Sequence, residues 1–264
     1  MNFHSLINLK GLKKEAKLFK KRKPFNYLII DNFLDTSFAN KLEKEIPNYN
    51  DEMWHEYNNP IEFKKLTNNW NHFKSNTYNI FSYLTSEKFS KELETNLKIR
   101  NIINDPGLHG GGIHIHKNGG KLNPHLDYFI HPKNNCIRKL NLLIYLNKNW
   151  KESYGGHLGF WEKKKGGLIL KKEILPKFNR AVIFDTSKNS WHGLSREVKS
   201  KNKIYRKHFA VYYLINNKGN LSGRKKALFE ATNDQKNNLE IRNLIKIRSN
   251  QKLWELEKKK INKK

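Results

Sequence analysis

The chain has 264 residues, of which 37% are hydrophobic and 12% aromatic, so it can bury a core, and disorder throughout the chain is excluded. Its single cysteine, Cys136, excludes an intrachain disulfide. No stretch approaches the roughly 20 apolar residues of a membrane-spanning helix, and the N-terminus lacks the features of a signal peptide. We therefore expect a cytoplasmic protein without a transmembrane segment.

The formal net charge of +28 has two interpretations. Such a charge favours nucleic acid, an acidic polymer or an anionic membrane as a partner. Alternatively, the 43 Lys against 9 Arg, together with 36 Asn, indicate a bias toward AT-rich codons. Residues 1–24 carry +7 of the charge and residues 217–264 carry +9. Nucleic acid stays a candidate partner, and the oligomeric state is left open.

The first 100 residues are predicted to be mainly helical. Residues 1–24 form a basic helical segment in this interpretation, because apolar residues recur at roughly helical spacing, and it packs on the body or contacts a membrane surface. A short buried strand follows at 25–34, and Asp35 is a candidate N-cap for a helix through Glu45. Two more helices are expected within 76–98. Residues 25–100 therefore form a helical support layer with one leading strand.

From residue 101 the pattern changes to short β-like runs separated by Gly, Asn and Pro. The runs are GGGIHIH, KLNPHLDYF, KLNLLIYLN, GGHLGFW, GLILKKEI, RAVIFDT and KHFAVYYLI. Many short strands at close spacing predict an antiparallel sandwich or small barrel over residues 101–216. Residues 217–264 are predicted to be a basic helical extension, with helical periodicity at Leu239, Leu244, Ile247 and Leu253.

His125 and Asp127 are the first candidate metal ligands. Alternate side chains of a strand share one face, so both residues can coordinate one ion, while Leu126 points to the opposite face of the strand. This pair is a weak signal by itself. His192, in SWHGLS, can supply the third ligand, and two His with one carboxylate suit a non-haem iron(II) site.

Five other histidines compete for a role. His114 and His116 also alternate, so they form either a cupin-like metal pair or one pocket-lining and one structural residue. His131, His157 and His208 are expected at the pocket edge or in hydrogen bonds.

An oxygenase with such a metal site must also hold a dicarboxylate co-substrate. Arg206 is the candidate cation, on a strand predicted at 204–215 whose alternation puts it on one face with His208, Ala210 and Tyr212. Lys203 and Lys207 are fallback cations. Tyr145 is predicted to donate its hydroxyl to the same carboxylate, or else to be a core tyrosine.

The run from Asp105 to Leu214 resembles the 2-oxoglutarate/Fe(II)-dependent dioxygenase superfamily, in particular its prolyl 4-hydroxylase-like branch. The similar pieces, in order, are GGGIHIHKNGGKLNPHLDYFIH, RKLNLLIYLNKNW, YGGHLGFWE, PKFNRAVIFDT, SWHGLS and YRKHFAVYYL. The resemblance places the family's catalytic iron ligands on His125, Asp127 and His192, and its co-substrate residues on Arg206 and Tyr145.

The resemblance implies a double-stranded β-helix of the jelly-roll or cupin-like kind. It implies Fe(II), 2-oxoglutarate and dioxygen, with ascorbate as a further candidate, and hydroxylation coupled to conversion of 2-oxoglutarate to succinate and CO2. His157 stands where many relatives carry Glu or an apolar residue, which affects the substrate more than the iron. The substrate, a protein side chain or a small molecule, is expected to contact loops 128–138 and 187–203.

The alternative to an enzyme is a catalytically degenerate β-helix module that docks nucleic acid or protein through its basic ends. The set of His125, Asp127, His192 and Arg206 is complete in this sequence, and a degenerate homologue would be expected to have lost a member.

Overall fold

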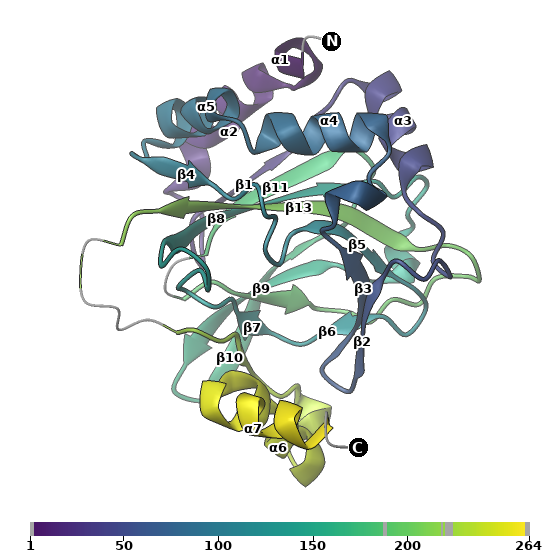
Figure 1. The fold of residues 1–264 in the computed structure, drawn as a ribbon, viewed down its shortest axis with the longest axis vertical. Coiled ribbons are helices and arrows are strands. Elements are labelled where there is room, and N and C mark those ends of the chain that lie inside the picture. Colours follow the sequence, from purple (N-terminus) through teal and green to yellow (C-terminus); the bar gives the residue numbers. More distant parts are fainter. Residues whose placement is uncertain (1–2, 187–188, 218, 220–223, 262–264) are drawn as a thin grey trace.

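A computed structural model describes residues 3–186, 189–217, 219 and 224–261. Two antiparallel sheets face each other, helices cover the outer face of the larger sheet, and a C-terminal helical pair lies at the far end (Figure 1). This confirms the predicted mainly β fold with flanking helices. No helix in the described ranges is both long enough and apolar enough to cross a bilayer. Predictions for residues 1–2, 187–188, 218, 220–223 and 262–264 lie outside the described residues.

Five helices precede residue 100, two in the basic segment 1–24 and three in the stretch 25–100 that was interpreted as helical support. Helices α1 to α5 span Phe3–Leu6, Leu9–Phe19, Thr36–Glu45, Ser75–Leu84 and Glu87–Leu97. The predicted N-cap is confirmed, because the Asp35 side chain accepts a hydrogen bond of 2.9 Å from the Phe38 amide. The basic segment packs on the body by burying Leu12 and Phe19 of α2.

The larger sheet has nine strands in the order β1-β11-β8-β13-β5-β3-β2, with β4 paired to β13 and β6 to β3. Its strands are β1 (Tyr27–Ile30), β2 (His55–Asn59), β3 (Glu62–Thr67), β4 (Ile102–Asn104), β5 (Gly112–His116), β6 (Lys121–Leu122), β8 (Ile137–Tyr145), β11 (Arg180–Asp185) and β13 (Arg206–Ile215).

The smaller sheet has five strands in the order β10-β9-β12-β7-β14. These strands are β7 (His125–Leu126), β9 (Leu158–Lys164), β10 (Gly167–Ile174), β12 (Trp191–Leu194) and β14 (Leu228–Phe229).

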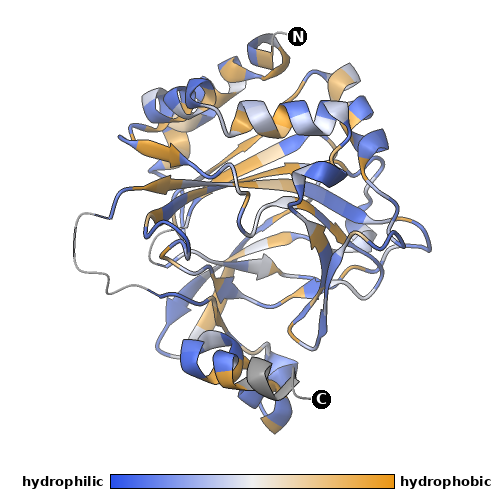
Figure 2. Cartoon of the chain, in the orientation of Figure 1, coloured by the Kyte–Doolittle hydropathy of each residue, from blue (hydrophilic) through white to orange (hydrophobic). Residues whose placement is uncertain are grey.

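Alternation along the long strands builds two separate cores, and the hydrophobic colouring of the large sheet and its helices follows the first of them (Figure 2). On β8, Leu142 and Ile144 pack against the helices, whereas Leu143 and Tyr145 face the smaller sheet. Side chains on β13 alternate in the same way, and Phe209 points toward the helices. Arg206 lies three residues away and therefore faces the smaller sheet and the cavity, as strand alternation predicts.

Five of the strands in the described residues were not predicted from the sequence, among them β4 and β12, which lie between or beside the predicted runs. The β2–β3 hairpin lies within the stretch interpreted as helical support, and it extends the larger sheet instead. β14 lies within the C-terminal extension and adds a fifth strand to the smaller sheet. The predicted C-terminal helices are present as α6 (Leu239–Ser249) and α7 (Gln251–Ile261). The four-part division of the chain stays a prediction, but the C-terminal part is built into the sheet.

Candidate active site

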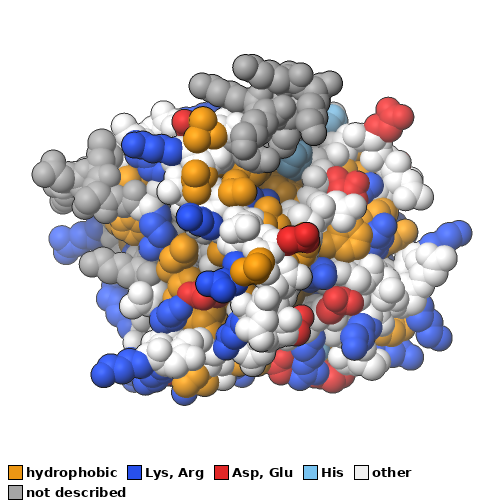
Figure 3. Space-filling model, turned by 90° about the horizontal axis from the view of Figure 1, so that it is seen from below, with side chains coloured by type: hydrophobic (Ala, Val, Ile, Leu, Met, Phe, Trp, Pro, Cys, Tyr) orange, Lys and Arg blue, Asp and Glu red, His pale blue; other side chains and the backbone are white. Residues whose placement is uncertain are grey.

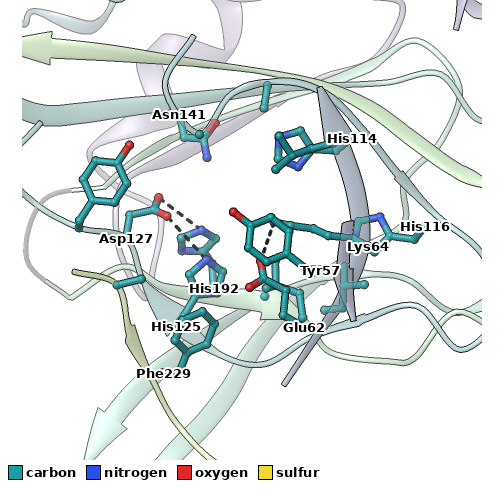
Figure 4. Close-up of a pocket in the computed structure, with 18 of the residues that line it drawn as sticks. Tyr57, Glu62, Lys64, His114, His116, His125, Asp127, Asn141, His192 and Phe229 are labelled. Atoms are coloured by element: carbon teal, nitrogen blue, oxygen red, sulfur yellow. Dashed lines mark ion pairs between the residues drawn. The ribbon is translucent and has the colours of Figure 1, made fainter. Parts of the chain in front are cut away.

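Three side chains converge between the sheets. β7 carries His125, Asp127 follows directly, and β12 places His192 opposite His125 in an antiparallel register. Their candidate ligand atoms all lie within 4.8 Å of one another, and all three residues are buried. Asp127 Oδ1 is 3.6 Å from His125 Nε2, and Oδ2 is 3.6 Å from His192 Nε2 (Figure 4). The structure thus brings the three predicted ligands together.

Backbone carbonyls fix the orientation of both imidazoles. Nδ1 of His125 lies 3.0 Å from the Asn123 carbonyl oxygen, and Nδ1 of His192 lies 2.8 Å from that of Ser190. Each Nδ1 therefore carries the proton, and each Nε2 presents a lone pair toward Asp127. Burial, with a smaller effect of His125, lowers the pKa of His192 to about 4. His192 is consequently neutral at ordinary pH, as a metal ligand must be.

The Asp127 carboxylate is held in its ionised form. Burial by itself would raise the pKa of Asp127, but His192 and His125, when they are protonated, and Arg138, with Nη1 3.8 Å from Oδ1, lower it well below its usual range. The Tyr212 hydroxyl donates to Asp127 Oδ2 over 3.1 Å. Two imidazoles and one carboxylate on one side of an ion leave positions open for other ligands, which suits Fe(II). The donor set present here therefore fits that metal.

Arg206 forms a buried cationic end to the same cavity. It is only 2% exposed, and within the described part of the chain no carboxylate forms an ion pair with it. Its Nε donates to the Gly156 carbonyl over 2.6 Å, its Nη2 lies 3.4 Å from the Tyr145 hydroxyl, and its Nη1 lies 3.1 Å from His208 Nδ1. Burial lowers the pKa of Arg206. A buried guanidinium without a counter-ion fits the carboxylate of a bound co-substrate.

Tyr145 is both a core residue and a neighbour of Arg206. The side chain is fully buried in the inner core, and burial raises its pKa. Because its hydroxyl oxygen accepts from Arg206, the hydroxyl proton stays available for a second acceptor. Both predicted alternatives for Tyr145 are therefore compatible with its position.

Gly156 is a residue of the site that sequence reasoning missed. Its φ is +64°, and an added Cβ would lie 2.8 Å from Cδ of Arg206. Glycine is needed here because a side chain would be strained by the backbone and would press on Arg206. The Gly155-Gly156 pair in the sequence was the available signal.

The other histidines do not join the three ligand atoms. His114 and His116 on β5 both line the cavity, and burial lowers the pKa of each well below its usual value. His208 also lines it, in register with His114. His131 and His157 each lie beside a carboxylate, at 3.4 Å from Asp105 and 3.0 Å from Glu152.

The cavity has a volume of about 690 Å³ and three walls. Two come from the facing sheets, with the β2–β3 hairpin contributing Tyr57, Glu62 and Lys64 (Figure 4). The third comes from the C-terminal segment 224–254, through Lys226, Ala227, Phe229, Arg248 and Trp254. Sequence reasoning missed both the hairpin and the C-terminal wall, because neither has a local pattern that marks it as part of a site.

The C-terminal segment also pairs with β7, the strand that carries His125 and leads directly to Asp127. Phe229 is the register partner of His125, and the Arg224 carbonyl accepts from the Phe129 amide over 2.7 Å. Nη2 of Arg224 donates to the Asp127 carbonyl over 3.2 Å. β7 is thereby held by β12 on one side and by residues 224–230 on the other.

Comparison with known proteins gives a family match over the central part of the chain and the fold. Residues 111–214 match the 2OG-Fe(II) oxygenase superfamily. No curated protein matches the chain in sequence. Among solved structures, a Pseudomonas putida prolyl-4-hydroxylase is 13% identical with a TM-score of 0.57, over 78% of this chain and 100% of its own.

Two more solved structures extend the comparison. A Trichoplax adhaerens prolyl hydroxylase in complex with a hypoxia inducible factor peptide is 16% identical with a TM-score of 0.54, over 78% of this chain and 91% of its own. HygX from Streptomyces hygroscopicus, with nickel, 2-oxoglutarate and hygromycin B bound, is 9% identical with a TM-score of 0.51, over 77% and 87%. These matches confirm the predicted double-stranded β-helix.

Proposed function

We propose that the chain, whose residues 111–214 match the 2OG-Fe(II) oxygenase superfamily, is a dioxygenase that hydroxylates a C–H bond of its substrate while converting 2-oxoglutarate to succinate. In the overall reaction, one oxygen atom of O2 enters the hydroxyl group and the other enters succinate, and CO2 is released. The bound iron supplies the oxygen-activating chemistry, and the protein supplies binding, orientation and exclusion of water.

One arrangement carries this proposal. His125, Asp127 and His192 converge within 4.8 Å, and Arg206, which has no counter-ion among the described residues, lines the same cavity. The three would hold Fe(II), and Arg206 would pair with the far carboxylate of 2-oxoglutarate, with Tyr145 as a hydroxyl donor. Tyr212 would keep Asp127 oriented through its 3.1 Å hydrogen bond.

The shape of the cavity limits the choice of substrate only to groups that can enter between its three walls. The similar fold occurs in a prolyl hydroxylase that holds a peptide and in a protein that holds hygromycin B. Either a protein side chain or a small molecule therefore fits the proposal, and the basic ends keep nucleic acid as a candidate partner. Ascorbate stays a candidate for reactivation of the iron.

The test is the uncoupled conversion of 2-oxoglutarate to succinate in the absence of substrate. We expect Fe(II)-dependent succinate formation in the wild type, none in His192→Ala, and wild-type rates in His72→Ala, a histidine outside the cavity. Equal rates in the two variants would exclude His192 as a ligand. No succinate from folded, iron-supplied wild type would contradict the proposed reaction.

A further inference from the structure

Two cations share one carboxylate in the cavity wall beside the metal ligands. Glu62 on β3 is 4% exposed, and its Oε1 lies 3.1 Å from Lys64 Nζ, whereas its Oε2 lies 2.7 Å from Nη2 of Arg248 (Figure 4 shows the Lys64 pair). Burial would raise the pKa of Glu62, but Lys64 and Arg248 lower it, so the carboxylate is ionised. One negative charge offsets only one of the two positive charges. The cluster therefore presents one net positive charge to the cavity.

Aromatic rings surround the Arg248 guanidinium. Its Cζ lies 5.5 Å from the ring centre of Tyr57 and 5.4 Å from those of Phe229 and Trp254. The three rings come from the hairpin, β14 and α7, and all of them line the cavity. A guanidinium has five N–H donors, and its hydrogen bond to Glu62 runs through Nη2. The remaining N–H groups of Arg248 can therefore donate hydrogen bonds to a second acceptor, which would lie between the aromatic rings.

The packing of α6 holds Arg248 in place. Ile241 is 9% exposed and clusters with Phe229 and Ile61, and the Phe229 amide donates to the Ser249 hydroxyl over 3.4 Å. Phe229 in turn stacks on His125, with ring centres 5.2 Å apart. The guanidinium is thus fixed close to the metal ligands, on a segment that lies outside the residues matched to the family.

The other charged groups of the cavity leave this excess uncompensated. Besides Glu62, the acidic side chains that line it in the described residues are Asp127, at the metal ligands, and Glu56, which is exposed on β2. The further cations there are Arg138, Arg206 and Lys226. On the face that carries the C-terminal helices, Lys and Arg side chains are spread among acidic and hydrophobic ones (Figure 3). The local cluster, rather than a basic stripe, is therefore the specific feature.

We propose that Arg248, supported by Lys64, binds an anionic group of the substrate, a carboxylate or a phosphate, while Tyr57 and Trp254 flank the attached body. This rests on the proposed function, since it assigns the substrate class of that same cavity. A cationic substrate would meet repulsion at the same place, so the cluster selects by charge.

Calorimetric titration of the anaerobic Fe(II)–2-oxoglutarate complex tests the proposal, because bound 2-oxoglutarate occupies Arg206. The probes are phenyl phosphate, phenylacetate and benzylamine, which share one ring and differ in charge. We expect at least one anion to bind and benzylamine to bind at least tenfold more weakly, on the order of one charge-assisted hydrogen bond. Binding of only one anion identifies the group as phosphate or carboxylate.

Two variants with opposite expected effects on anion affinity distinguish loss of anion recognition from damage to the fold. Arg248→Gln should weaken anion binding about tenfold, whereas Glu62→Gln should strengthen it, because it leaves both cations uncompensated. Arg242→Gln removes the same charge from an exposed position of α6 and should leave binding unchanged. If Arg248→Gln fails to fold, the gain in Glu62→Gln still carries the test.

Equal binding of benzylamine and the anions, or equal effects of Arg248→Gln and Arg242→Gln, would overturn the proposal. Failure of the wild type to form the Fe(II)–2-oxoglutarate complex would instead contradict the proposed function. A complex that forms but binds neither anion contradicts the charge recognition alone.

Discussion

The ring of Phe229 stacks on the ring of His125, with centres 5.2 Å apart and an interplanar angle of 22°. A residue of the C-terminal segment thus covers the first predicted iron ligand, and the same two residues are register partners in the β14–β7 pair. The segment that the sequence marks as a basic extension is consequently a wall of the candidate active site.

Phe229→Ala should therefore weaken both the fold and the metal site. The side chain is 4% exposed, and removing a buried phenyl ring costs about 3–5 kcal/mol of unfolding free energy. We expect a lower unfolding midpoint and weaker Fe(II) binding in the folded fraction. Leu256→Ala, at a 57% exposed position of α7, is the control and should change neither. Unaltered Fe(II) affinity in Phe229→Ala would show that the C-terminal wall does not position His125.

Asp127→Ala should abolish iron-dependent turnover. It removes the only carboxylate among the three converging side chains and leaves two imidazoles. The measurement is iron content after anaerobic loading, together with succinate formation. Asp185→Ala, a carboxylate on β11 outside the cavity, controls for the loss of a buried acid. Full activity of Asp127→Ala would remove Asp127 from the ligand set.

Arg206→Ala should weaken 2-oxoglutarate binding far more than iron binding. Loss of a buried charged hydrogen-bonding partner corresponds to about 1.5–3 kcal/mol, or roughly ten- to hundredfold in affinity. Arg180→Ala, which breaks an ion pair with the mainly exposed Asp31, should leave 2-oxoglutarate affinity unchanged. An equal loss of iron and 2-oxoglutarate binding in Arg206→Ala would indicate a folding defect rather than a co-substrate role.

Gly156→Ala should act on the co-substrate through Arg206. The new Cβ would lie 2.8 Å from Arg206 Cδ at a φ of +64°, which costs on the order of 1–3 kcal/mol in strain. We expect weaker 2-oxoglutarate binding with iron binding retained. Gly166→Ala is the matched control, because no atom lies within 4 Å of its added Cβ. Wild-type 2-oxoglutarate affinity in Gly156→Ala would show that Arg206 tolerates the displacement.

The metal-free protein should lose stability as the pH falls from about 6.5 toward 5. Burial lowers the pKa values of His114, His116 and His208 well below the usual value, and that of His192 to about 4. In this window the unfolded chain binds protons that the folded chain does not, so protonation favours unfolding. Urea unfolding at pH 7 and pH 5 measures the effect. Equal unfolding free energies at the two pH values would contradict the neutral, buried state of these imidazoles.

Strand alternation explains why much of the site could be predicted. The spacing of His125 and Asp127 and the parity of Arg206 and Tyr145 are local, and the structure places these residues as that parity requires. The order of the pieces along the chain then allowed the fold to be recognised by resemblance.

The remaining parts depend on contacts that have no local signature. The hairpin sequences HEYNN and EFKKLT are too polar for alternation to stand out, and β14 has only two residues. The ion pair of Glu62 with Arg248 joins residues 186 positions apart. No periodicity in either segment could indicate that they meet at the cavity.

The most direct measurement is an anaerobic titration of the purified protein with Fe(II) and then 2-oxoglutarate, followed by the visible charge-transfer band of the chelate, in wild type and His125→Ala. We expect a band in the wild type that is lost in the variant while both proteins remain folded. A well-folded, iron-supplied wild type without a band, or a band that survives in His125→Ala, would contradict that expectation.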